Sequence, residues 1–191
     1  FRRVLFRSNG TLNTFADLKG RALALPSPVS MHHTWVDRGA RKAGIAMNDI
    51  NLVYLTFPEM MSALTSERID AAYLPEPFAT NAVEKLNAVR WLDPNEIQPQ
   101  TVVTVWVYSE RLSATDRETG RKFMVALLRG ARDYLDGMEK KKDRAAIVAA
   151  LVNHTRIKDP ALYDKMQIPS IAPNGELRME SLRDKIGRAH V

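Results

Sequence analysis

The stretch Ile69-Asp70-Ala71-Ala72-Tyr73-Leu74-Pro75-Glu76-Pro77-Phe78 decides how the fold is interpreted. Its first six residues are mostly apolar and predict a short buried strand. The proline at position 77 suits the first position of a helix, because its missing N–H would have no partner there. A carboxylate beside that helix start is favoured by the helix dipole, and such strand-to-helix turns are where open α/β sheets bind small molecules. The stretch therefore predicts a ligand-facing turn or, as the alternative, a Glu76 that only caps the helix.

Short strands and amphipathic helices alternate on both sides of this stretch. Strands are predicted at residues 21–25, 51–55, 69–74, 89–92 and 101–108. Helices are predicted from Ser30 to Gly44, from Pro58, from Pro77, at 123–138, at about 143–153 and after Asp159-Pro160. This alternation is typical of a mostly parallel sheet covered by helices. The fold class is therefore α/β, with helices only after about residue 109.

The long helix predicted at residues 123–138 carries apolar side chains at three- and four-residue steps. We interpret its methionine and aromatic stripe as core packing and not as a cofactor site. The run Lys140-Lys141-Lys142 that follows is interpreted as a solvated junction between helices.

The two ends of the chain look foreign to the rest. Residues 3–8 and 186–191 can be encoded by one DNA segment read on opposite strands, and both resemble translated sequencing adapter. We expect residues 1–8 and 186–191 to be artefacts outside the fold and residues 9–185 to be an internal piece of a longer natural chain. Without the four arginines of these ends, the basic count falls from 28 to 24 against 22 acidic residues, and the net charge falls from +6 to +2. Such a charge gives no support for nucleic acid or a membrane surface as a partner.

The patterns of the common catalytic and metal sites are missing from the sequence. There is no phosphate-binding Gly-rich loop, no nucleophile elbow, no His-Glu-x-x-His and no carboxylate cluster spaced for a metal. The chain has no cysteine, which excludes disulfides and thiolate ligands. No apolar run approaches the ~18 residues that a membrane span needs. The sequence therefore predicts a protein that is not an enzyme and has neither cofactor nor metal.

A loop rich in proline and serine, Pro26-Ser27-Pro28-Val29-Ser30, links the first strand to a helix that Ser30 would cap. Backbone N–H groups, the hydroxyls of Ser27 and Ser30 and an imidazole would meet at this helix start. Such a point suits an oxyanion or a polar heterocycle. Glu76, if it faces the same cleft, would instead accept hydrogen bonds from N–H or hydroxyl donors. Together the two features predict a ligand that carries both kinds of group.

The histidines of this region, His32 and His33, allow two interpretations. Adjacent residues on a helix point in different directions, so the pair cannot readily share a metal ion. Either one of them contacts a polar ligand near the helix start, or both are plain surface or packed side chains.

The order of these features resembles a known family, the substrate-binding proteins of ABC importers of the nitrate, sulfonate and thiamine-precursor type, called SsuA/THI5-like or NMT1-like. The resemblance covers almost all of residues 9–185, and the order of the landmarks is more specific than any one of them. In chain order they are Thr14-Phe15-Ala16-Asp17-Leu18-Lys19-Gly20, Ser30-Met31-His32-His33, Lys42-Ala43-Gly44, Ala63-Leu64, Ile69-Asp70-Ala71-Ala72, Glu76-Pro77-Phe78 and Tyr108-Ser109-Glu110.

The resemblance implies a two-lobed, type II periplasmic-binding-protein fold that holds its ligand between the lobes. Residues 9–108 would form the second lobe, and residues 109–185 would be helices packing on the lobes and returning to a first lobe. The strand at 101–108 would approach the crossing between lobes, where Trp106 either stacks on a flat ligand or packs in the core. The candidate ligand contacts are Ser27, Ser30, His32, His33, Tyr73, Glu76 and Trp106.

The implied function is that of the solute-binding component of an ABC importer. It would capture a small polar or anionic molecule, of sulfonate, nitrate, carboxylate or pyrimidine type, and deliver it to permease and ATPase subunits. The implied location is the periplasm, or a lipid anchor on the outer face of the inner membrane. Two alternatives share the fold: a THI5-like pyrimidine synthase, whose cysteine-rich pattern this chain lacks, and the effector-binding domain of a transcriptional regulator.

Overall fold

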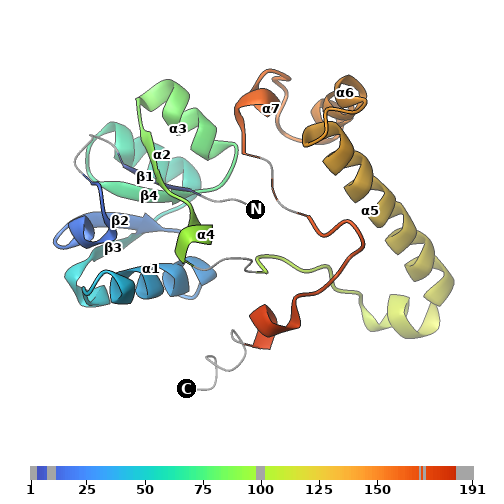
Figure 1. Cartoon of the computed structure of the whole chain (residues 1–191), viewed down its shortest axis with the longest axis horizontal. Helices are drawn as coiled ribbons and strands as arrows, with labels where there is room; N and C mark the ends of the chain where they lie inside the picture. The colour runs from blue at the N-terminus through green and yellow to red at the C-terminus, as the bar shows by residue number, and fades with distance from the viewer. Residues whose placement is uncertain (1–3, 8–11, 98–101, 168, 170, 184–191) are drawn as a thin grey trace. The chain divides into compact units, whose positions relative to one another are not determined.

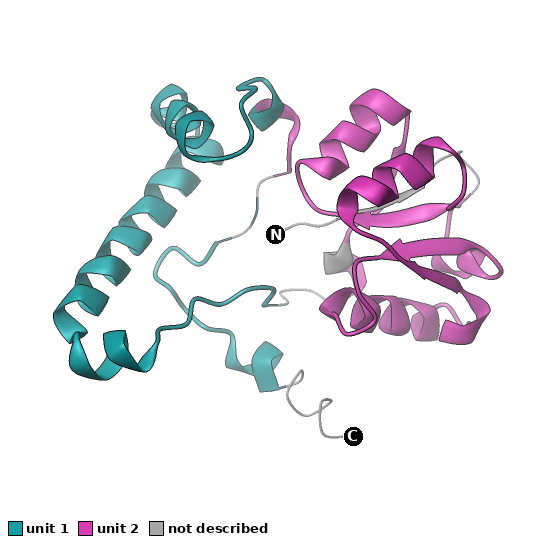
Figure 2. Cartoon of the chain, turned by 180° about the vertical axis from the view of Figure 1, so that it is seen from behind, with its two compact units in different colours: residues 1, 100–163, 168–191 teal, residues 2–99, 164–167 magenta. Residues whose placement is uncertain are grey.

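The computed structural model describes residues 4–7, 12–97, 102–167, 169 and 171–183. The chain forms two compact units (Figure 2). Unit 2 contains Arg2–Pro99 and the short segment Asp164–Gln167, and unit 1 contains Gln100–Tyr163 and Ile168–Val191. The described part of unit 2 is α/β, and that of unit 1 is helical with connecting segments.

Unit 2 is built on a five-stranded sheet with the order β3-β2-β4-β1-β5. The strands are β1 (Val4–Arg7), β2 (Ala22–Leu25), β3 (Asn51–Tyr54), β4 (Ala71–Leu74) and β5 (Val89–Leu92). β2 pairs in parallel with β3 and β4, whereas β1 runs antiparallel to both of its neighbours, β4 and β5. The predicted mostly parallel α/β sheet is confirmed, and the four strands expected between residues 21 and 92 are all present.

Helices cover both faces of this sheet (Figure 1). Helix α1 (Met31–Lys42) lies on one face, and α2 (Phe57–Thr65) and α3 (Phe78–Leu86) lie on the other. Because α1 connects β2 to β3 and α2 returns the chain past β2 to β4, the strand order reverses between β2 and β4. The short helix α4 (Pro94–Ile97) follows β5.

The register between β2 and β4 is held by Asp70, a residue that the sequence already marked. The Asp70 carboxylate accepts a hydrogen bond from the backbone N–H of Ala22 at 2.8 Å, and the N–H of Asp70 donates to the carbonyl of Ala22 at 2.9 Å. Leu23 is thereby set opposite Ala71. This fixed register brings the loop after β2 and the turn after β4 to the same edge of the sheet.

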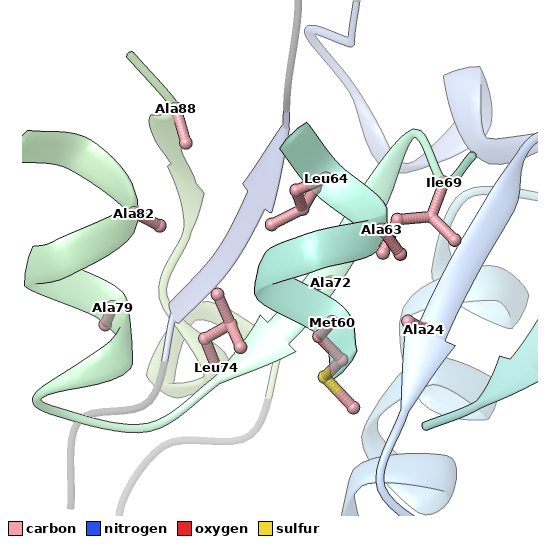
Figure 3. Packing of buried hydrophobic residues seen from close by; sticks show 10 residues of the cluster. All are labelled: Ala24, Met60, Ala63, Leu64, Ile69, Ala72, Leu74, Ala79, Ala82 and Ala88. Carbon is pink, nitrogen blue, oxygen red and sulfur yellow. The ribbon is translucent and has the colours of Figure 1, made fainter. Parts of the chain in front are cut away.

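The core beneath α2 and α3 is made mostly of small residues, which let the helices approach the strands closely (Figure 3). Its buried members are Ala24, Met60, Ala63, Leu64, Ile69, Ala72, Leu74, Ala79, Ala82 and Ala88. On the opposite face, α1 buries Trp35, Val36 and Ala40, as its apolar spacing predicts. Gly44, with φ at +71°, ends this helix in the left-handed conformation that favours glycine.

The strand β1 comes from the end segment that the sequence interpretation left outside the fold. Its backbone at Val4–Arg7 pairs with β4 on one side and β5 on the other. A short run of β-prone residues fills the position beside β4, whose backbone groups would otherwise lack partners in the sheet. That these residues derive from adapter sequence stays a prediction.

Unit 1 contains α5 (Arg117–Met138), α6 (Arg144–His154) and α7 (Leu162–Lys165), the last of which ends in unit 2. The helices predicted at 123–138 and about 143–153 are confirmed. The strand predicted at 101–108 is wrong, because residues 102–108 form no regular structure and Thr101 lies outside the described residues. Strands form when a neighbouring strand satisfies their backbone groups, and the described residues of unit 1 contain no other strand. The helix after Pro160 is a single turn instead of a longer element.

The apolar stripe of α5 is packed only in part. Met138 is buried near the contact with α6, where Ile147 lies against Gly137, whereas Phe123 is 44% exposed. The interpretation of the whole stripe as core is therefore wrong for the described residues, since one helix and a short turn cannot cover a helix of 22 residues. The Lys140-Lys141-Lys142 junction is exposed, as predicted.

Burial in unit 1 makes a testable prediction for Tyr134. Burial, with smaller contributions from Glu139 and Tyr163, raises the pKa of the Tyr134 phenol from 10.0 to about 12. A pKa raised by folding means that the stabilising contribution is complete below about pH 10 and is lost as the pH rises towards about 12. We expect the near-ultraviolet tyrosinate titration to lose a step near pH 12 in Tyr134→Phe. The free energy of unfolding of this variant should also fall less steeply above about pH 10. A titration curve unchanged by the substitution would contradict this assignment.

Candidate functional site

Three helix starts meet the carboxyl edge of the sheet in unit 2. Because β2, β3 and β4 are parallel, the turns that lead from them into α1, α2 and α3 all lie at this edge. The strand order reverses between β2 and β4, and ligands of open α/β sheets bind in the crevice at such a reversal. The predicted Pro/Ser loop follows β2 and the Glu76 turn follows β4, so the two turns come from neighbouring strands, although α1 and α3 leave them towards opposite faces.

The start of α1 offers hydrogen-bond donors and no negative charge. Ser30 is the N-cap, as predicted: its Oγ accepts from the N–H of His33 at 3.4 Å and donates to the carbonyl of Ser27 at 2.8 Å. The Oγ of Ser27 accepts from the N–H of Val29 at 3.2 Å, and its own proton has no acceptor among the described residues. Val29 beside it is 92% exposed. First-turn N–H groups have no partner within a helix, so this loop can receive an anion.

The other two helix starts are occupied by carboxylates. At α2, Glu59 accepts from the N–H and the hydroxyl of Thr56, at 2.8 and 2.7 Å. These hydrogen bonds, that of the side chain first, lower the pKa of Glu59, so the carboxylate is ionised at neutral pH. At α3, Glu76 accepts from the N–H and the hydroxyl of Thr80, at 3.0 and 2.7 Å. Of the three starts, only that of α1 has no acidic residue acting as its cap.

Two of the candidate ligand contacts, His32 and Tyr73, are packed into an aromatic cluster with Trp35. The His32 and Tyr73 ring centroids lie 4.1 Å apart, and Trp35 lies 5.9 Å from the first and 5.8 Å from the second. All three are buried, with Tyr73 only 1% exposed. The cluster lies between β4 and α1, where it supports the helix start from below. His32 is thus a packed side chain, whereas its role as a ligand contact stays a prediction; the neighbouring His33 is half-buried.

Glu76 uses both carboxylate oxygens within unit 2. Oε2 accepts from Thr80, and Oε1 accepts from the Arg90 guanidinium at 2.9 Å and from the N–H of Gln167 at 3.2 Å. The Glu76 side chain is 9% exposed. Helix α3 begins at Phe78, one residue later than expected, with Pro77 as its N-cap. The geometry is that of the alternative interpretation, a carboxylate that caps the helix.

Trp106, the remaining candidate, lies in unit 1. It is 69% exposed, and its ring meets Phe123 of α5 edge-on with centroids 6.2 Å apart. The interpretation of Trp106 as a core residue is therefore wrong. Its role as a ligand contact stays a prediction.

Three residues that were not among the predicted site residues surround Glu76, namely Thr80, Arg90 and Gln167. Thr80 could have been found, because a threonine four residues after a capping carboxylate can donate to it within one turn. Arg90 and Gln167 lie 14 and 91 residues away, and no local pattern connects them to Glu76. The ring pair Phe57 and Phe78, 5.7 Å apart at the starts of α2 and α3, was also missed. Both phenylalanines are the first helical residue after the cap, a position that marks them as neighbours of this edge.

Each unit also carries a surface cavity among its described residues. A cavity of about 260 Å³ lies at the C-terminal ends of α2 and α3 and includes Leu64 and Lys85. Another, of about 410 Å³, lies along α6 and includes Val148 and Pro160. The described residues contain no group of three or more His, Cys, Asp or Glu side chains placed to hold a metal ion. None of the helices in the described part is both long and apolar enough to cross a membrane.

Comparison with known proteins yields one family and several relatives. The NMT1-like family matches residues 11–152, which is more than half of the chain. A protein of Escherichia coli (strain K12) named for the binding of aliphatic sulfonates is 31% identical over 80 residues, 42% of this chain and 25% of that protein. An ABC transporter periplasmic binding protein of Brachyspira hyodysenteriae is 34% identical over 67 residues, 35% of this chain and 19% of that protein.

Solved structures resemble the chain over its whole length. The periplasmic aliphatic sulphonate binding protein SsuA from Escherichia coli has a TM-score of 0.71 at 19% identity, and the match covers 100% of this chain and 61% of that one. The alkanesulfonate-binding protein SsuA from Xanthomonas axonopodis pv. citri, bound to MOPS, has a TM-score of 0.68 at 19% identity over 99% and 63%. These likenesses show the fold of periplasmic binding proteins, of which the chain spans somewhat under two thirds.

Proposed function

The chain belongs to the NMT1-like family, and from this premise we propose that it is the solute-binding component of an ABC importer. Its solute is a small anion, and a sulfonate is the first candidate among the sulfonate, nitrate and carboxylate types, with a neutral pyrimidine as the polar alternative. The four proteins reported above are binding proteins by name, and three of them are named for sulfonates. The proposal requires no bond to be made or broken.

The observation that carries this proposal is the uneven charge of the three helix starts. An anion that reaches the carboxyl edge meets a carboxylate at α2 and another at α3, but only donors at α1. The N-terminal end of a helix carries roughly half a positive charge. We therefore assign the anionic group of the solute to the first turn of α1, with Ser27 as a side-chain donor and Ser30 as the cap whose hydrogen bond to the carbonyl of Ser27 orders the turn.

The other candidate residues receive different roles in this proposal. His33 borders the same helix turn and serves as a further polar contact, whereas His32 and Tyr73 hold the helix start from beneath. Glu76 holds the neighbouring turn, since its oxygens already accept four hydrogen bonds. That the aromatic ring of Trp106 contacts a solute stays a separate proposal.

The partners follow from the same proposal. Unit 2 would supply one wall of a cleft, and the opposing wall would come from the part of a two-lobed protein that this chain does not match. The loaded protein would dock on a permease served by an ATPase subunit. We propose the periplasm as its location, with a lipid anchor on the outer face of the inner membrane as the alternative form.

A thermal-shift panel on the complete protein tests the proposal. The panel contains ethanesulfonate, nitrate, propionate and a neutral pyrimidine, each at a concentration well above the expected Kd. A ligand at about 100 times its Kd stabilises the folded state by about 2.7 kcal/mol. We expect the sulfonate to raise Tm most and the neutral pyrimidine to leave it unchanged. A rise with the pyrimidine alone, or with none of the four, would overturn the proposal.

A further inference from the structure

The segment Asp164–Gln167 packs with unit 2, although Tyr163 before it and Ile168 after it belong to unit 1. Figure 2 shows this short piece in the colour of unit 2. After Pro99 the chain continues in unit 1, returns to unit 2 at Asp164 and leaves it again after Gln167. This return to unit 2 consists of four residues. We call these four residues the strap.

Polar contacts of Lys165 and Gln167 attach the strap to unit 2. Lys165 forms an ion pair with Glu84 of α3, and the N–H of Gln167 donates to Oε1 of Glu76 at 3.2 Å. The ion pair is about half exposed on both sides, and exposed pairs of this kind hold little. The contact with the buried Glu76 is therefore the stronger attachment.

Glu76 keeps its other partners when the strap leaves. Arg90 donates to the same oxygen at 2.9 Å, and Thr80 donates twice to the other oxygen. A buried carboxylate that lost its only partner would be strongly destabilised. Because Glu76 remains paired with Arg90, release of the strap would not leave an unpaired buried carboxylate in unit 2.

Gln167 itself is incompletely satisfied in the attached state. Its side-chain Oε1 is buried and has no hydrogen-bond partner among the described residues. A buried acceptor without a partner opposes the attached state, and release would return this oxygen to water. One hydrogen bond to a charged oxygen thus favours attachment while one unsatisfied oxygen of the same residue opposes it.

From these opposing contacts we propose that Asp164–Gln167 is a releasable strap and that Glu76 is the latch that holds it. Glu76 also caps α3 and ends the turn after β4, so the latch lies at the carboxyl edge of the sheet. The strap is thereby joined to the edge at which the solute is proposed to bind. The proposal goes beyond the solute-binding function and does not depend on any ligand.

Limited proteolysis with trypsin tests the latch on the complete protein without ligand, because the Lys165-Met166 bond lies within the strap. Gln167→Pro removes the backbone donor to Glu76, whereas Gln167→Ala keeps this donor and removes the unsatisfied oxygen. We expect Gln167→Pro to speed cleavage after Lys165 about tenfold, since losing a hydrogen bond to a charged group has about this effect on an equilibrium. Gln167→Ala should slow the cleavage. Equal rates for the two variants would overturn the proposal.

A change at the latch itself gives an independent reading. Glu76→Gln keeps the shape of the side chain and removes its charge, so cleavage after Lys165 should again accelerate by about tenfold. Cleavage after Lys42 in α1 and after Lys85 in α3 reports general loosening of unit 2. The proposal requires the effect to be confined to Lys165. If Glu76→Gln speeds all three sites alike, or leaves Lys165 unaffected, Glu76 is a cap of α3 and not a latch.

Discussion

Replacing Tyr73 with alanine should lower the free energy of unfolding by about 3–5 kcal/mol, the range observed when a large buried aromatic side chain is deleted. Tyr73 is 1% exposed and lies within van der Waals reach of His32, with Trp35 beside it. The substitution would leave a cavity directly beneath the start of α1. Because β4 is held by its neighbours in the sheet and α1 packs against that sheet, neither element can move to fill the cavity. The loss should therefore fall at the upper part of this range.

A matched control for this prediction is Tyr54→Ala on β3, another strand of the same sheet, where the tyrosine is 42% exposed. Its loss should be well below that of Tyr73→Ala, because about two fifths of the residue is already exposed to water and its removal opens no closed cavity. Urea denaturation measures both variants, with an unchanged m-value showing that the comparison concerns stability alone. Similar losses at the two tyrosines would show that the aromatic cluster does not support α1 as described.

Local signals in the sequence were sufficient to predict most strands and helices of unit 2. The strands are runs of apolar residues ended by loop residues, and α1 begins at Ser30 and ends before Gly44 because a capping hydroxyl and a glycine at positive φ act within one turn. Asp70 was marked as a landmark, and it proves to join β2 to β4. Features whose causes lie within a few residues could be predicted.

What could not be predicted depends on partners far along the chain. Residues 102–108 have the composition of a strand, but a strand needs a neighbour, and the described residues of unit 1 provide none. The same limit applies to Glu76, whose role is decided by Arg90 and Gln167. A sequence motif located the Glu-Pro turn but could not show that its carboxylate was already occupied.

The sequence predicted where the candidate site lies, but not how each of its side chains is placed. Ser27 and Ser30 lie at the start of α1 as expected, while His32 and Tyr73 lie below it in the core. The position of His32 in the first turn of α1 did not show which way its ring points. Only its contact with Tyr73 of β4 shows that the ring faces the sheet. The contrast between an uncharged α1 start and the acidic starts of α2 and α3 emerged only from the hydrogen bonds.

Exchanging Ser30 for aspartate should nearly abolish binding of an anionic solute while leaving the fold intact. Asparagine and aspartate are both good N-caps, so Ser30→Asn and Ser30→Asp should preserve α1 equally. A carboxylate about 4 Å from a bound anion would repel it by roughly 4 kcal/mol at an effective dielectric constant near 20. Rearrangement and solvent reduce this value, and we expect an increase in Kd of about 100-fold for the aspartate, against a few-fold for the asparagine.

The affinity ratio of these two variants is the most direct test of an anion site at the start of α1. It is measured by isothermal titration calorimetry of the complete protein with ethanesulfonate, after circular dichroism has shown equal Tm values for both variants. The account predicts that Ser30→Asp binds about 100-fold more weakly than Ser30→Asn. Equal affinities would contradict it, because an anion held at this helix turn cannot be indifferent to a negative charge at its cap.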